Sequence, residues 1–157
     1  MGYNKRFNLT IKNLTYRLRR FNEILDQELK DEIIRHSDTI IAMITQDQLY
    51  ELGINGRGQV IMEYMPYRPR TIKKKIRKGQ PYNRVTLKDT GKLYKSLHLE
   101  FDDKGFFVKA NDDKAKYLLK KYGRTIFRLS NENLTYLLNN YIRPSLKEKM
   151  KNYLQNG

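Results

Sequence analysis

The sequence feature that most restricts the fold is a long stretch near the N-terminus in which apolar residues recur every three or four positions. The stretch covers about residues 9–35, and its apolar positions are Ile11, Leu14, Leu18, Phe21, Leu25, Leu29 and Ile33. This spacing places them on one side of an α-helix, and the other side carries mostly charged residues. We therefore predict a long amphipathic helix whose apolar face packs against other parts of the chain.

A second helical region and a glycine-rich turn are expected next. Ser37 or Asp38 is a suitable N-terminal cap for this region, and Gly53 suits its C-terminal end. The sequence GINGRGQ (53–59) follows a helix and has no Gly-Lys-Ser/Thr ending, so we interpret it as a turn and not as a phosphate-binding loop. Residues 60–67 are expected to be extended.

The second half of the chain alternates between helical and strand patterns. LHLEFDDKGFFVKA (97–110) has alternating apolar residues on both sides of a polar turn, which is typical of a β-hairpin. A short helix is predicted for residues 114–123. A final helix should begin at Ser130 or Asn131 and be interrupted or restarted near Pro144, because proline disrupts a helix interior.

These elements predict an α+β fold with a long N-terminal helix, a small antiparallel sheet and a C-terminal helix. We expect a single domain over residues 1–157. Within it, residues 1–52 would form a helical region, residues 53–92 a basic loop or arm, and residues 93–157 a helix-hairpin-helix core with the C-terminal helix.

The triplet Asp89-Thr90-Gly91 also occurs in the active site of aspartic proteases, where two carboxyl groups share one proton. Here Lys88 and Lys92 flank the triplet, and neighbouring cations favour the ionised form of Asp89. The predicted helix content also differs from the strand-rich protease fold. We interpret the triplet as a turn in which Asp89 or Thr90 caps a short helix, and we predict that the protein is not an enzyme.

Positive charge is concentrated between residues 68 and 92. The whole chain has 32 Lys and Arg against 17 Asp and Glu, a net charge of +15. In this stretch TIKKKIRKGQ (71–80) is predicted to form a short basic helix, and Asp89 is the one acid. The basic residues are Arg68, Arg70, Lys73, Lys74, Lys75, Arg77, Lys78, Arg84, Lys88 and Lys92. Such a stretch fits nucleic acid, an acidic protein neighbour or a solvated helix surface.

Composition excludes several classes of site. Cysteine is absent, which removes disulfides, thiolate catalysis and cysteine-based metal sites. His36 and His98 are the only histidines and lie far apart in the sequence, so we expect no metal and no cofactor. No secretory signal pattern and no apolar run long enough to cross a membrane is seen, and we expect a soluble intracellular chain without a membrane partner.

The chain is rich in aromatic residues, with 12 Tyr and 6 Phe. Most of these rings are expected in the core, but tyrosine is also favoured at protein interfaces because its ring is apolar and its hydroxyl is polar. Three tyrosines lie beside prolines in segments predicted to be extended. We therefore add Tyr64, Tyr67 and Tyr82 to Arg68, Arg70, Lys73, Lys74, Lys75, Arg77, Lys78 and Arg84 as candidates to face a protein partner or DNA.

Four segments, in order, resemble the virion morphogenesis family of tailed phages, the small head–tail connector and neck proteins related in fold to tail terminators. The segments are LKDTGKLYKSL (87–97), AKYLLKKYG (115–123), RTIFRLSNENLTYLL (124–138) and YIRPSLKEKM (141–150). Residues 48–91 are also similar to segments common in phages and prophages of gut Bacteroidetes, including crAss-like phages.

This resemblance implies a structural virion protein that forms a homo-oligomeric ring, most often six- or twelve-fold, around the DNA channel. The ring would sit at the phage neck, the head–tail junction or the upper tail, after assembly in the host cytoplasm. Its partners would be other neck, portal or tail proteins, with possible non-specific contact to packaged DNA. A basic nucleic-acid-binding protein is the alternative, although no known nucleic-acid-binding module is recognisable in the sequence.

Overall fold

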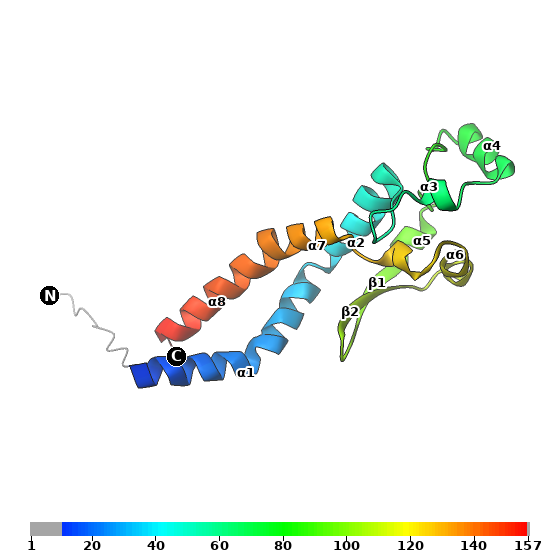
Figure 1. Cartoon of the computed structure of the whole chain (residues 1–157). Helices are drawn as coiled ribbons and strands as arrows, with labels where there is room; N and C mark the ends of the chain where they lie inside the picture. Colours follow the sequence, from blue (N-terminus) through cyan, green and yellow to red (C-terminus); the bar gives the residue numbers. More distant parts are fainter. Residues whose placement is uncertain (1–10, 157) are drawn as a thin grey trace. The chain divides into compact units, whose positions relative to one another are not determined.

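The computed structural model describes residues 11–156, and these form an α+β fold, as predicted (Figure 1). Helices predominate, and one two-stranded antiparallel sheet lies in the middle of the described sequence. The elements are α1 (Ile11–Arg35), α2 (Ser37–Ala42), η1 (Met43–Leu52), α3 (Ile61–Tyr64), α4 (Pro69–Arg77), α5 (Lys92–Lys95), β1 (Leu97–Asp102), β2 (Gly105–Ala110), α6 (Ala115–Tyr122), η2 (Arg124–Phe127), α7 (Asn131–Leu137), η3 (Leu138–Ile142) and α8 (Arg143–Asn156).

The described chain divides into two compact units, and the single domain over residues 1–157 stays a prediction. The first unit combines residues 11–35 with residues 137–156, and the second contains residues 36–136. The two ends of the chain therefore fold together, while the middle forms a unit of its own.

The first unit pairs α1 with η3 and α8. The predicted long helix is confirmed from Ile11 to Arg35; residues 9 and 10 of that prediction lie outside the described residues. Phe21 is buried, and its ring centre lies 5.8 Å from that of Tyr153 on α8. The Lys149 ammonium of α8 lies 2.9 Å from the buried carboxylate of Glu32 and also pairs with Glu28. A ring contact, these ion pairs and a hydrogen bond from the Arg17 guanidinium to the Leu154 carbonyl join the two helices.

The C-terminal helical segment begins and changes as the sequence suggests. Ser130 acts as the N-cap, because its hydroxyl oxygen accepts a hydrogen bond from the Asn133 amide at 3.2 Å. The segment changes to a π-helical turn over Leu138–Ile142 before α8 begins at Arg143. Pro144 lies in the first turn of α8, and its missing N–H and bulky ring disturb the preceding turn.

The second unit has an apolar centre built by several short elements. Its completely buried side chains include Ile40, Ile44, Leu49, Ile61 and Ile126. A buried amide connects distant segments of this unit: Gln48 Nε2 donates to the Arg128 carbonyl at 3.0 Å, and Gln48 Oε1 accepts from the Ser130 amide at 2.7 Å. Because the short elements form few hydrogen bonds inside themselves, such connections between segments hold the unit together.

The predicted hairpin is confirmed. Strands β1 and β2 pair antiparallel from Leu97 opposite Ala110 to Asp102 opposite Gly105. The tip, residues 102–105, is exposed, and the sheet has two strands, so each strand has one edge without a strand partner within the described chain. Two-stranded sheets are marginally stable alone, which makes contacts at the hairpin base important.

Two local predictions are wrong. His36, and not Ser37 or Asp38, is the N-cap of α2, and no side chain caps that helix. Residues 60–67 are not extended, because Ile61–Tyr64 forms the short helix α3, whose Ile61 is completely buried. The need to bury Ile61 overrides the weak local preference of this segment.

Candidate functional site

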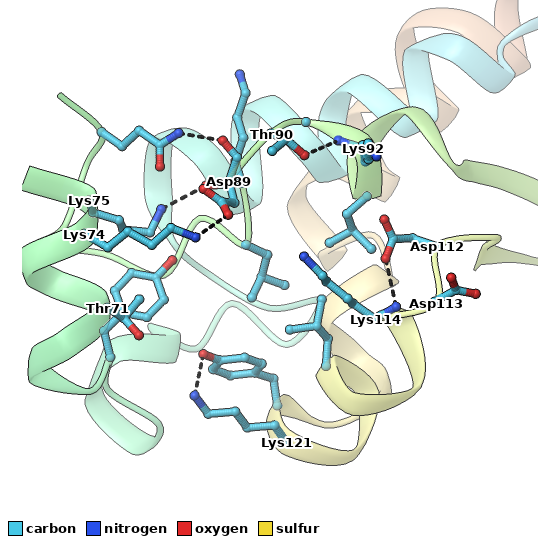
Figure 2. Close-up of a pocket in the computed structure, with 18 of the residues that line it drawn as sticks. Thr71, Lys74, Lys75, Asp89, Thr90, Lys92, Asp112, Asp113, Lys114 and Lys121 are labelled. Atoms are coloured by element: carbon cyan, nitrogen blue, oxygen red, sulfur yellow. Dashed lines mark hydrogen bonds and ion pairs between the residues drawn. The ribbon is translucent and has the colours of Figure 1, made fainter. Parts of the chain in front are cut away.

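A cavity of about 510 Å³ lies within the second unit, between α4, the turn around Asp89, the turn after β2, and α6 (Figure 2). This volume is typical of sites that bind a small molecule or a few residues of a peptide. Six lysines and three aspartates line it: Lys74, Lys75, Lys88, Lys92, Lys114 and Lys121, with Asp89, Asp112 and Asp113. The lining is therefore cationic overall, as the charge pattern of the sequence suggests.

Helix α4 forms one wall of the cavity, and the basic side chains of α4 and of Lys78 after it have three different environments. Pro69 occupies the first turn, where its missing N–H costs nothing, and Gly79 with φ +61° follows the helix end. The predicted basic helix is thus confirmed. One lysine points into the unit, two side chains bind Asp89, and Arg70, Lys73 and Arg77 remain exposed.

Lys75 is the buried member of this helix. Its Nζ donates to Thr86 Oγ1 at 3.0 Å and to the Lys88 carbonyl at 2.9 Å, and lies 5.2 Å from the ring centre of Tyr67. Burial lowers the pKa of the Lys75 ammonium, because the charged form loses its hydration. This ammonium joins α4 to the segment that leads into the Asp89 turn, and Lys75 also lines the cavity, so its contact with a partner or DNA stays a prediction.

Thr86 is the centre of the buried polar contacts. Its amide donates to the Tyr67 hydroxyl oxygen at 2.9 Å, and its carbonyl accepts a hydrogen bond from the Tyr94 hydroxyl. Burial raises the pKa of Tyr94, which keeps this phenol protonated. Tyr67 is itself buried and lines the cavity, and its role as an interface residue stays a prediction. These bonds fix the base of the cavity.

Asp89 is held by lysines that are distant in the sequence. Its carboxylate binds the Lys74 ammonium at 2.7 Å and also pairs with Lys78, while its carbonyl accepts from Gln80 Nε2 at 2.7 Å. Hydrogen bonds from Lys74 and Lys78 lower the pKa of Asp89 to about 2. A carboxylate held by two ammonium groups differs from the proton-sharing pair of an aspartic protease.

The triplet does form the predicted turn, but with another capping arrangement. Gly91 has φ +83°, a left-handed conformation that favours glycine, and it precedes α5. Thr90 Oγ1 accepts a long hydrogen bond of 3.4 Å from the Lys92 amide, whereas the Asp89 carboxylate binds lysines and caps no helix. Lys88 directly precedes the triplet, and its ammonium lies 4.5 Å from the ring centre of Tyr50.

The opposite wall contains residues that sequence reasoning missed. Asp112 Oδ1 accepts from the Lys114 amide at 2.8 Å, and Lys121 Nζ donates to the Tyr122 hydroxyl oxygen at 2.9 Å. In Figure 2 Lys114 and Lys121 lie across the cavity from Lys74 and Lys75. The sequence of residues 114–123 predicts a lysine-rich helix, but it does not indicate that this helix lies opposite α4, because that position depends on the tertiary fold.

Two features of the cavity are unusual for a purely structural site. Leu87, which lines it, has φ +54°, a conformation that branched residues avoid at a cost of about 1–3 kcal/mol. Gln80 Oε1 is buried without a hydrogen-bond partner, although Gln80 Nε2 is bonded to the Asp89 carbonyl. Strained backbone and unsatisfied buried acceptors are found preferentially at functional sites.

The other predicted interface residues lie outside this cavity. Arg84 Nε donates to the Tyr50 carbonyl at 2.6 Å, which attaches its segment to η1. The hydroxyl of Tyr64 donates to the Tyr122 carbonyl at 3.3 Å although its ring is 43% exposed. Tyr82 is exposed, as are the basic candidates Arg68, Arg70, Lys73, Arg77 and Lys78, of which Lys78 pairs with Asp89. These exposed residues remain available to a partner.

Residues 11–156 contain no group of three or more His, Asp or Glu side chains arranged to hold a metal ion. Among the same residues, every helix is too short or too polar to cross a membrane. Comparison with protein-family models, with curated proteins and with solved structures gave no match.

Proposed function

We propose that this chain is a structural subunit that assembles with copies of itself into a ring. Its suggested place, at the neck or head–tail junction of a tailed phage, rests on the resemblance of residues 87–150 to head–tail connector proteins. One observation carries the assembly proposal: α1 leaves large apolar side chains exposed along its length. They are Ile11, Leu14, Tyr16, Leu18, Ile24 and Ile34.

Helix packing explains why these side chains need a partner. In α1 only Phe21 and Glu32 are buried, although the helix has 25 residues. Two paired helices bury only the side chains along their line of contact, whereas bundles of more helices enclose a wider apolar core. Ile11, Leu14 and Leu18 follow each other at helical spacing, and such an exposed apolar stripe marks a protein contact. A second copy of this chain is the occupant that we propose.

The test is the mass of the purified full-length chain, measured by native mass spectrometry and light scattering. We expect a defined multiple of the 18.9 kDa chain mass. The variant Leu14→Asp/Leu18→Asp should shift the protein toward monomer. The matched control, Asn22→Asp, changes an exposed polar residue of the same helix and should leave the mass unchanged. A wild-type monomer at all accessible concentrations would refute this proposal.

Nucleic-acid binding is a second candidate, and the outer side of α4 favours it. Arg70, Lys73 and Arg77 are exposed there, and they surround a shallow hollow together with Ile76. None of the three makes an ion pair with a carboxylate in residues 11–156. A row of free cations on one helix side suits contact with phosphates.

Salt dependence distinguishes this second candidate. If these three cations contact phosphates, the logarithm of DNA affinity should fall with the logarithm of salt concentration by about 0.9 per phosphate contact. The variant Arg70→Gln/Lys73→Gln/Arg77→Gln should flatten that slope without dissociating the oligomer. If the wild type binds DNA only weakly and the variant has the same salt slope as the wild type, DNA is not the partner of α4.

A further inference from the structure

The cavity beside Asp89 presents a specific combination of charged groups that have no ion-pair partner in the described part of the chain. Lys92, Lys114 and Lys121 line it and have no carboxylate within ion-pair distance among residues 11–156. On the same lining, the carboxylate of Asp113 is exposed. An occupant that satisfies these groups must bring both negative charge and N–H donors.

A peptide segment with acidic side chains meets this requirement better than a nucleic-acid backbone. Acidic side chains would pair with these lysines, and peptide N–H groups would donate to Asp113. A phosphodiester backbone offers acceptors alone and has no N–H group to donate to Asp112 or Asp113 on the cavity wall. The apolar part of the lining, which includes Leu93 and Leu118, would contact an apolar residue beside the acids.

We propose that the hairpin tip of a second copy of this chain, residues 102–105, occupies this cavity. The tip sequence Asp-Asp-Lys-Gly is exposed throughout, and Asp103 makes no ion pair within the described residues. Phe107, two residues beyond the tip, has 39% of its surface exposed. In a chain of net charge +15, this is an exposed, acidic segment with an apolar neighbour. The inference rests on the proposed self-assembly, and it identifies one of its contacts.

The position of the cavity excludes docking of the tip within its own chain. The cavity lies at the base of the hairpin, because Asn111 lines it directly after β2 and its amide donates to the Ser96 carbonyl before β1 at 3.2 Å. Each strand has six residues, so the tip lies about 20 Å from that base at roughly 3.3 Å per residue. The tip can therefore reach only the cavity of another copy.

Such a contact joins two different surfaces of the subunit. A tip on one subunit and a cavity on the next make a head-to-tail contact, and repeating it closes a ring when the rotation permits. Both surfaces belong to the second unit, so this contact does not involve the apolar stripe of α1. Cation–carboxylate contacts of this kind set the orientation and specificity of an interface.

The absence of cysteine from the sequence permits a direct mapping experiment. Full-length Asp103→Cys is mixed with full-length Lys121→Cys and treated with a short bis-maleimide linker. We expect a covalent dimer that contains one copy of each variant. As a matched control, Lys151→Cys places an exposed cysteine on α8, and it should not link to Asp103→Cys. Linkage to the control as efficient as to Lys121→Cys would overturn the proposal.

Charge reversal provides the second arm. Asp102→Lys/Asp103→Lys alone and Lys114→Asp/Lys121→Asp alone should each associate roughly tenfold more weakly or worse, while a mixture of the two should associate again. Circular dichroism checks that each variant is folded. If both variants assemble like the wild type, the inference fails while the proposed oligomer stands. A wild-type monomer would refute both. Protection of Lys121→Cys from maleimide by a DNA oligonucleotide, without tip linkage, would assign the cavity to nucleic acid instead.

Discussion

The ion pairs of Asp89 should stabilise the second unit measurably, and Asp89→Asn tests this. The substitution keeps the shape of the side chain but removes the charge that Lys74 and Lys78 bind. The Gln80 bond to the Asp89 carbonyl remains, because it involves the backbone. The variant therefore isolates the electrostatic connection between α4 and the turn before α5.

The pKa of Asp89 gives the magnitude. It falls from an ordinary value of 3.8 to about 2 in the folded chain, and each pKa unit corresponds to about 1.4 kcal/mol. This sets an upper limit of about 2.5 kcal/mol. Because the Asp89 side chain is 39% exposed, water screens both pairs, and we expect Asp89→Asn to lower the free energy of unfolding by about 1–1.5 kcal/mol at pH 6.

The pH dependence identifies the cause. A carboxyl group whose pKa is lower in the folded chain stabilises it fully above the unfolded pKa of 3.8 and loses this effect as pH falls toward about 2. Urea unfolding of both proteins is measured from pH 6 down to the lowest pH at which both remain folded. The difference between them should shrink below about pH 4.

Two results would refute this reasoning. Equal unfolding free energies at pH 6 would mean that the lysines contribute nothing through Asp89. A difference that persists undiminished at low pH would mean that Asn is tolerated poorly for another reason, such as altered packing. Asp47→Asn is the matched control, because Asp47 is exposed on η1 in the same unit and its carboxylate makes no ion pair within residues 11–156, and its unfolding should match the wild type.

Four further substitutions test the packing of the two units. Gly56→Ala should destabilise the chain by about 2–4 kcal/mol in thermal unfolding, because the new Cβ would lie 2.5 Å from the Arg128 carbonyl oxygen; Gly58→Ala meets no atom within 4 Å and should cost about 1 kcal/mol for its positive φ alone. Gln48→Leu should cost about 2–4 kcal/mol in urea unfolding, since it leaves two buried backbone groups without hydrogen bonds; an unchanged midpoint would show that water replaces the amide. Lys149→Met should cost about 3 kcal/mol, because it leaves a buried glutamate of α1 without this ammonium, and a neutral effect would indicate that the glutamate becomes protonated.

The sequence by itself determined the elements whose signals are local. The three-four spacing of apolar residues predicted α1, and alternation around Asp-Asp-Lys-Gly predicted the hairpin with its correct ends. Gly91 was correctly interpreted as part of a turn, and Ser130 as a helix cap. In each case the residues that decide the conformation lie within a few positions of one another, so no distant contact is needed.

Only the tertiary structure decided which residues of the basic stretch are available to a partner. Lys73, Lys74 and Lys75 are consecutive and chemically equal in the sequence, yet one is exposed, one binds Asp89 and one is buried. Lys75 turns inward because Thr86 Oγ1 and a backbone carbonyl, more than ten positions later, provide acceptors for its ammonium. Helical period gives the direction of each side chain, but the neighbour that it meets depends on long-range packing.

The candidate site depended on tertiary structure for the same reason. Its two walls come from α4 and α6, which are separated along the chain by the Asp89 turn and the whole hairpin. Because β2 runs antiparallel to β1, the chain after β2 returns to the level where β1 begins. This places Asn111 beside Ser96 and brings Lys114 and Lys121 to the cavity. The sequence specified the charges, and the closure of the hairpin decided that they face one another, because only chain reversal brings distant segments within contact distance.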